Sequence, residues 1–156
     1  MAKMNFHSEG NLTAAFSAIC DRAKNALLAQ QHTLMIRLTD RILELTPVWE
    51  GDSIVNWRWS PDGNFEELDH RGGEIPTGPT NFMSLGEEPR RSVNEAVVRQ
   101  SLAQALQGKV LHDMYLTNAS DSIVALEYGQ LPTPATSRSP HGIVRIAIIE
   151  IMGSLH

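Results

Sequence analysis

Cysteine is almost missing from this sequence. Cys20 is the single cysteine among 156 residues, so the chain cannot form an internal disulfide. The six histidines are scattered, without the close spacing that would organise a zinc site. No glycine-rich loop followed by Lys and Ser or Thr is present to bind nucleotide phosphates. We therefore expect neither a metal nor another cofactor.

Long apolar runs and basic clusters are missing as well. The opening residues, MAKMNFHSEG, have no signal-peptide core, and no later run approaches the length of a membrane span. We therefore expect no membrane contact and assembly in a reducing cytoplasm. The formal net charge of −5 disfavours a DNA-binding module, because neutralising phosphates requires clustered Lys and Arg. DNA binding stays open only as a third hypothesis.

Aromatic residues are sparse, at 6% of the chain. Hydrophobic residues (42%) and charged residues (20%) have proportions that are ordinary for a globular protein. A length of 156 residues fits one domain with its own core and is short for two. We therefore treat residues 1–156 as a single domain.

The first third of the chain has the period of a long amphipathic helix. After Asn11, a suitable N-cap, apolar residues return mostly every three or four positions, and no Gly or Pro interrupts them before Pro47. These positions are Leu12, Ala15, Phe16, Ile19, Ala23, Ala26, Leu27, Leu34, Leu38, Ile42 and Leu45. Such a helix would span roughly 50 Å and project beyond a small domain. We expect either a plain core helix or a contact between subunits.

A strand and a long loop are expected next. The alternation from Ile54 to Trp59 predicts a strand that packs Val55, Trp57 and Trp59 against the first helix. Stacking of these Trp rings on nucleotide bases is the functional alternative. Residues 60–90 are rich in proline, glycine and acids, which predicts one long acidic loop. This loop is either a solvated insert or a segment that extends across a partner subunit.

The rest of the chain completes the expected fold. Ser92 with Glu95 forms a capping box that predicts the start of a second helix. Residues 110–116 predict a strand, and residues 123–126 a strand or short apolar segment. Pro140 is the expected first residue of a closing helix, although the isoleucines there fit a strand nearly as well. The fold class is α+β: a long N-terminal helix and a second helix on a small, mostly antiparallel β-sheet.

One short block hints at catalysis. Gly51-Asp52-Ser53-Ile54 resembles the segment that carries the nucleophile in one family of lipases and esterases. In that family a buried strand precedes the block and an Asp-x-x-His supplies the base, whereas here a long helix precedes Ser53 and no Asp-x-x-His occurs. We expect no enzyme, and keep a small hydrolase centred on Ser53 as the alternative from another class.

Two separated stretches resemble the neck and tail-completion proteins of tailed bacteriophages. The first is Thr46-Pro47-Val48 followed by Gly51 and Asn56-Trp57. The second is Leu116-Thr117-Asn118, then Ala125-Leu126-Glu127-Tyr128-Gly129, then Pro140-x-Gly142-Ile143-Val144-Arg145. Their order and spacing agree with the family. The chain departs from it at residues 121–123, where the family often has Pro-Tyr-Ala, and at residues 132–139, where a shorter link is more common.

The resemblance implies a structural virion protein that joins the tail tube to the head as a ring in the neck, commonly a hexamer. Its partners would be copies of itself and other neck, connector and tail-tube proteins. DNA would pass through the lumen without specific binding. A tail terminator or head-side stopper of the same connector is the alternative within this machine.

The resemblance also selects candidate residues for contact between subunits or for ordering loops. They are Glu127, Tyr128, Gly129, Arg145, Trp57 and Pro47. Gly129 would permit a turn with positive φ. The guanidinium of Arg145 would suit a carboxylate such as that of Glu127. The alternatives to these roles are a core position for Tyr128 and a buried hydrogen-bond acceptor for Glu127.

Overall fold

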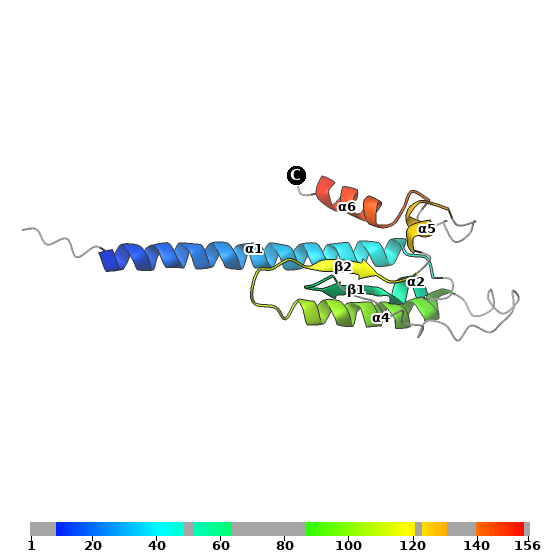
Figure 1. Cartoon of the computed structure of the whole chain (residues 1–156), viewed down its shortest axis with the longest axis horizontal. Coiled ribbons are helices and arrows are strands. Elements are labelled where there is room, and N and C mark those ends of the chain that lie inside the picture. Colours follow the sequence, from blue (N-terminus) through cyan, green and yellow to red (C-terminus); the bar gives the residue numbers. More distant parts are fainter. Residues whose placement is uncertain (1–8, 49–51, 64–86, 121–122, 131–139, 155–156) are drawn as a thin grey trace, which may run out of the picture.

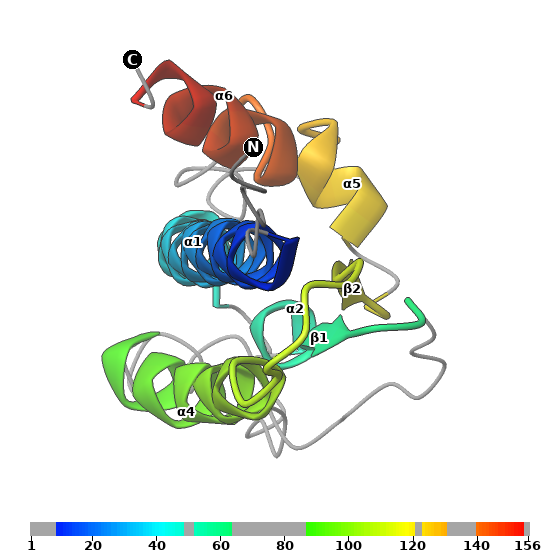
Figure 2. The same ribbon diagram turned by 90° about the vertical axis from the view of Figure 1, so that its left-hand side faces the viewer.

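The structure, a computed structural model, describes residues 9–48, 52–63, 87–120, 123–130 and 140–154. Its elements in chain order are α1 (Glu9–Leu45), α2 (Asp52–Val55), β1 (Trp57–Ser60), α4 (Glu87–Ala105), β2 (Tyr115–Asn118), α5 (Ile123–Glu127) and α6 (Val144–Gly153). The C-terminal half of α1 lies between α6 on one side and α4 on the other, with the small sheet beside it (Figures 1 and 2). The α+β fold class is confirmed.

Helix α1 is 37 residues long and confirms the predicted N-terminal helix. It begins before Asn11, which lies inside it, and ends at Leu45 because Pro47 disfavours helical geometry in the preceding residue. Its C-terminal half buries one face from Met35 onward, and its N-terminal half extends clear of the other elements (Figure 1). No helix within the described ranges has the length and apolar character needed to cross a membrane.

The sheet has two antiparallel strands, with Trp57 opposite Asn118 and Ser60 opposite Tyr115. The strand predicted from Ile54 is shorter than expected, because Ile54 and Val55 belong to α2. Both of these side chains are fully buried, which suits a helical turn better than a strand, where successive side chains point to opposite faces.

The predicted packing of the two Trp side chains on the first helix is confirmed. The indole Nε1 of Trp57 donates to Thr46 Oγ1 at 3.0 Å, and that of Trp59 donates to Thr39 Oγ1 at 2.8 Å. Thr39 lies within α1, and Thr46 directly follows it. These bonds satisfy the polar end of each indole while the ring of Trp57 is buried.

Helix α4 starts at Glu87, so the capping box predicted at Ser92 is wrong: Ser92 lies inside the helix. An earlier start is reasonable because Glu87, Glu88 and Pro89 are all favourable in a first helical turn.

The last segments are mostly helical. The strand predicted over residues 110–116 starts only at Tyr115 and runs on to Asn118 as β2. Residues 123–126, predicted as a strand or a short apolar segment, belong to the short helix α5. The closing segment is helix α6, which begins at Val144, four residues later than predicted. Most of the expected loop over residues 60–90 lies outside the described residues, since only its ends, residues 60–63 and 87–90, are described.

The hydrophobic core gathers where α1 meets the other elements. It contains Ile42, Leu43, Leu45, Val48, Ile54, Trp57, Val98, Leu126, Ile143 and Ala147. Residues from α1, α2, β1, α4, α5 and the start of α6 all contribute, so a single core joins both sides of α1. The described elements therefore share one core, while the single domain over residues 1–156 stays a prediction.

Candidate functional site

The carboxylate of Glu127 lies at the start of helix α6. Its Oε2 accepts hydrogen bonds from the backbone N–H groups of Ile143 (2.7 Å) and Val144 (2.8 Å), and its Oε1 accepts one from Arg145 (3.1 Å). The first N–H groups of a helix have no partner within the helix, and they carry the positive end of its dipole. Ile143, at the N-cap, provides no side-chain bond. Glu127 therefore caps α6 from 16 residues upstream.

Gly142 makes this cap possible. Its φ is +103°, and a Cβ at this position would lie 2.6 Å from the carbonyl oxygen of Glu127. Contacts below 3.0 Å with a backbone atom force the chain to shift, so glycine is required here. The glycine of the Pro-x-Gly sequence is thus explained by the close approach of the chain to Glu127.

Gly129 ends helix α5 on the other side of the same junction. Its φ is +64°, as predicted, and its N–H donates to Leu126 O at 3.3 Å. The N–H of Gln130 donates to Ala125 O at 2.8 Å, so the last carbonyls of α5 are bonded by a left-handed glycine cap. A Cβ on Gly129 would lie 3.2 Å from the carbonyl oxygen of Pro140. The Leu-Glu-Tyr-Gly segment and the Pro-x-Gly segment are therefore in contact.

Arg145 contacts Glu127 in a different way from the expected one. The backbone N–H of Arg145 makes the bond, while the guanidinium Nη2 donates to the carbonyl oxygen of His141 at 2.7 Å. The helix start already directs its N–H groups at the carboxylate, so the side chain of Arg145 is free to reach back along the chain. Glu127, Gly129 and Arg145 are therefore brought together at one junction.

The other three candidate residues lie elsewhere. Trp57 is buried beside Thr46, and Pro47 is half-buried just beyond the end of α1. Tyr128 has 66% of its surface exposed, so it is not a core residue. The core role considered for Tyr128 is therefore wrong, while its role in ordering a loop or contacting a neighbouring subunit stays a prediction.

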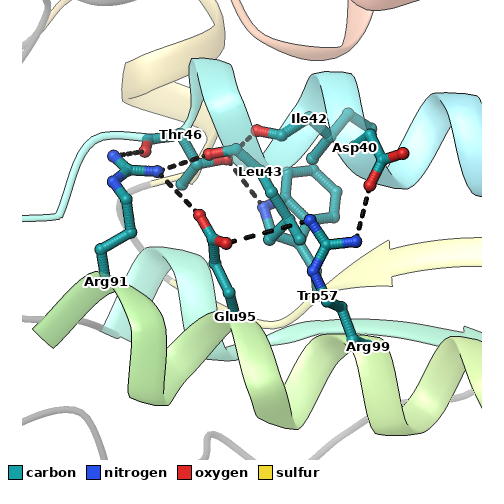
Figure 3. A network of polar contacts seen from close by, with 8 residues as sticks. All are labelled: Asp40, Ile42, Leu43, Thr46, Trp57, Arg91, Glu95 and Arg99. Carbon is teal, nitrogen blue, oxygen red and sulfur yellow. Dashed lines mark hydrogen bonds and ion pairs between the residues drawn. The ribbon is translucent and has the colours of Figure 1, made fainter. Parts of the chain in front are cut away.

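Arg91, which the sequence patterns did not single out, caps the C-terminal end of the long helix α1. Figure 3 shows its buried guanidinium pointing from α4 to the C-terminus of α1. Nη1 donates to Leu43 O at 2.7 Å and Nη2 to Thr46 O at 2.9 Å. These carbonyls lie at the negative end of the helix dipole, where a cation is favourable. Glu95 lies 3.4 Å from Arg91 Nη1 and adds charge balance.

The charges continue along the same face of α4. Arg99 Nη1 pairs with Asp40 of α1 at 2.6 Å, and its Nη2 lies 3.9 Å from Glu95 (Figure 3). Arg91, Glu95 and Arg99 follow each other at intervals of four, the spacing that places side chains on one face of a helix. The alternation of positive and negative charge at these three positions is the sequence pattern from which this contact between α1 and α4 could have been predicted.

A third polar cluster lines an open groove between α1 and α6, where Arg41 lies between two carboxylates. Its Nε and Nη2 both bond the carboxylate of Glu150, the latter at 2.9 Å, and its Nη1 donates to Glu44 at 2.7 Å. The bonds from Arg41 lower the pKa of Glu150 below its ordinary value, and Glu150 and Glu44 raise the pKa of Arg41 further above its own. The cluster holds the end of α6 against α1.

Ser53 and Asn118 have a structural contact. The side-chain Nδ2 of Asn118 donates to the carbonyl oxygen of Ser53 at 2.7 Å, and its Oδ1 accepts from Ser120 N at 2.8 Å. Asn118 therefore ties β2 to α2. Throughout the part of the chain that is described, no three His, Cys, Asp or Glu side chains gather as a metal site would require.

The arrangement around Glu127, Arg91 and Arg41 is that of structural joints. In each joint the charged group bonds backbone or side-chain groups of a neighbouring element. Chemically these joints fix the angles between helices. Comparison with known proteins finds no matching family model, curated protein or solved structure.

Proposed function

We propose that this chain is a structural subunit of the head–tail joint of a tailed bacteriophage, and that copies of it, commonly six, form a ring in the neck of the virion. The observation that carries the proposal is the junction of Glu127, Gly129 and Gly142. Residues drawn from two separated parts of the neck-protein motif meet there, and each has a defined structural task. This is the result expected if the motif residues form a structural junction that the family shares.

The first stretch of the resemblance supports the same proposal. Asn56 and Trp57 come from that stretch, and Leu116 to Asn118 open the second. β-Strand pairing places Trp57 directly opposite Asn118. The indole of Trp57 also bonds Thr46, which begins the first stretch. Residues that are far apart in the sequence, but belong to the same resemblance, therefore form one structural unit.

The surface of α1 supports assembly with other chains. Leu12, Phe16 and Ile19 have 73%, 68% and 61% of their surfaces exposed, all on the part of the helix that extends past the body (Figure 1). Large apolar side chains grouped on a projecting helix are typical of a contact surface. A ring joint requires such surfaces, whereas a monomeric enzyme has no need of them.

Two experiments test the proposal. Light scattering and negative-stain imaging of the purified chain should show annular particles with a central hole, and a solely monomeric species at every concentration would contradict it. In the phage that encodes the chain, disruption of its gene should give filled heads and finished tails that stay apart. Tails of uncontrolled length would instead indicate a tail terminator, and heads that lose their DNA a stopper.

The hydrolase alternative is tested by the variant Ser53→Ala. The proposal expects ring formation and phage infectivity to be unchanged by this substitution, and esterase assays of the original chain to give no turnover. Turnover that depends on Ser53 would favour the hydrolase. The carbonyl of Ser53 still accepts its bond from Asn118 in this variant, so this contact between β2 and α2 is kept.

A further inference from the structure

The N-terminal half of α1, residues 12–27, is called the arm here. Residues 11–20, NLTAAFSAIC, include no charged residue, although all side chains from Leu12 to Ile19 are exposed. A helix that stays in solvent normally carries charges on its outer face. This first part of the arm, which precedes the charged residues Asp21, Arg22 and Lys24, therefore has the composition of a helix that is covered in the working state of the protein.

The spacing on the arm indicates what kind of element covers it. Leu12, Phe16, Ile19, Ala23 and Ala26 follow one another at steps of four, three, four and three residues. This average period of 3.5 is typical of a helix that packs along another helix, since it keeps one apolar seam facing the partner. The two alanines allow a close approach, and the seam is about 21 Å long.

Helix α6 offers a second uncovered apolar surface. Its inner side packs Ala147 and Ile151 toward α1, next to the buried N-cap residue Ile143. On its outer side Ile148, Ile149 and Met152 are each about half exposed, and α6 lies at the outside of the molecule (Figure 2). A helix that is apolar on both sides is typical of one that is buried on both sides.

We propose that the arm of one copy of this chain packs against the outer side of α6 of the next copy. The arm cannot reach its own α6, because α6 lies along the C-terminal half of the same continuous helix and the arm leads away from it (Figure 1). Pairing of two arms would leave the outer side of α6 uncovered. One contact between arm and α6 covers both surfaces.

Such a contact joins two different surfaces of identical chains. A contact of this kind is head-to-tail, and it generates a ring when the rotation between neighbours closes. The inference therefore rests on the proposed ring and names the surfaces that form it.

Disulfide trapping in the full chain tests the contact. In a Cys20→Ala background, which removes the only cysteine, three variants are compared: Phe16→Cys, Met152→Cys and the double variant. Under mild oxidation the double variant should give a ladder of covalently linked chains, while each single variant stays uncrosslinked. Dimers of Phe16→Cys alone would show that arms pair with arms and would overturn the proposal.

A second measurement does not depend on disulfide geometry. Phe16→Asp and Ile149→Asp should each raise the protein concentration needed for assembly at least tenfold, as measured by light scattering. Val110→Asp is the matched control, because Val110 is 71% exposed and lies on neither surface. Unchanged assembly of both variants would overturn the proposal, and so would an effect of Phe16→Asp confined to binding of anionic lipid vesicles.

The two proposals fail separately. Rings that persist in Phe16→Asp and Ile149→Asp would overturn the arm contact and leave the neck ring in place. A ladder from the double variant, with open filaments and no ring in any preparation, would support the arm contact and contradict the neck ring.

Discussion

The carbonyl oxygen of Glu127 lies only 2.6 Å from the point where residue 142 would carry a β-carbon, so residue 142 must be glycine. The same approach lets the carboxylate of Glu127 reach the first N–H groups of α6. The helix cap and the glycine therefore depend on each other. Replacing either Glu127 or Gly142 should loosen the start of α6.

Gly142→Ala should destabilise the protein by about 3 kcal/mol, because it adds a clash with a backbone atom to an unfavourable positive φ. Urea unfolding followed by circular dichroism measures this change. The matched control is Gly153→Ala, since Gly153 ends the same helix and nothing lies within 4 Å of the point where its β-carbon would be. That control should be neutral or stabilise by up to about 1 kcal/mol, and equal losses in both variants would contradict the explanation.

Glu127→Ala should cost about 2–3 kcal/mol, since three N–H groups lose a charged acceptor. Glu127→Gln keeps one oxygen and should cost about half as much. Hydrogen exchange adds a local measurement: the amides of residues 143–145 should exchange faster in both variants. Glu44→Gln removes an exposed carboxylate, and should change stability by no more than about 0.5 kcal/mol. Slow exchange at 143–145 in Glu127→Ala would show that the cap is not needed.

Arg91→Met should destabilise the protein by about 2–4 kcal/mol, because the carbonyls of Leu43 and Thr46 lose their donors inside the protein. Arg91→Lys should recover only part of this, since one ammonium cannot copy the fork of a guanidinium. Arg99→Met is the control on the same helix, where the side chain is half exposed, and should cost less than about 1 kcal/mol. Equal costs at Arg91 and Arg99 would argue against the helix cap.

The pair of Arg41 and Glu150 should make the docking of α6 sensitive to acid. Because the folded state lowers the pKa of Glu150, the stabilisation is complete above its ordinary value of about 4.5 and is lost as the pH falls through the lowered value. The difference in unfolding free energy between the original chain and Glu150→Gln should therefore be present at pH 7 and shrink below about pH 4. A difference that is constant from pH 7 to pH 3 would contradict this assignment.

The elements set by local pattern were predictable. An uninterrupted period of three to four residues ending at Pro47 was enough for α1, and the two Trp residues marked the face of β1 that meets it. The helix α2 was not predictable, because its four residues are too few for a period and Ile54-Val55 favours a strand when read alone.

The polar contacts that join one element to another were the hardest feature to predict from the sequence. The partners of Arg91 lie 45 and 48 residues away, and they are carbonyl groups, which every residue has. The motif residues Glu127 and Gly142 could be found by resemblance, but their task depends on a distance that only the folded chain defines. Sequence patterns identify faces of helices and strands, whereas these contacts join helix ends.

The part of α1 that precedes its first buried residue acts as a lever. The helix is first buried at Met35, and Leu12 lies roughly 35 Å beyond that pivot. A tilt of about 5° at the pivot would swing Leu12 sideways by about 3 Å, close to the width of a methyl group. Small changes where Trp59 and Arg91 bond to the helix are therefore magnified at its far tip. In the proposed ring, such changes would alter the angle at which one subunit meets the next.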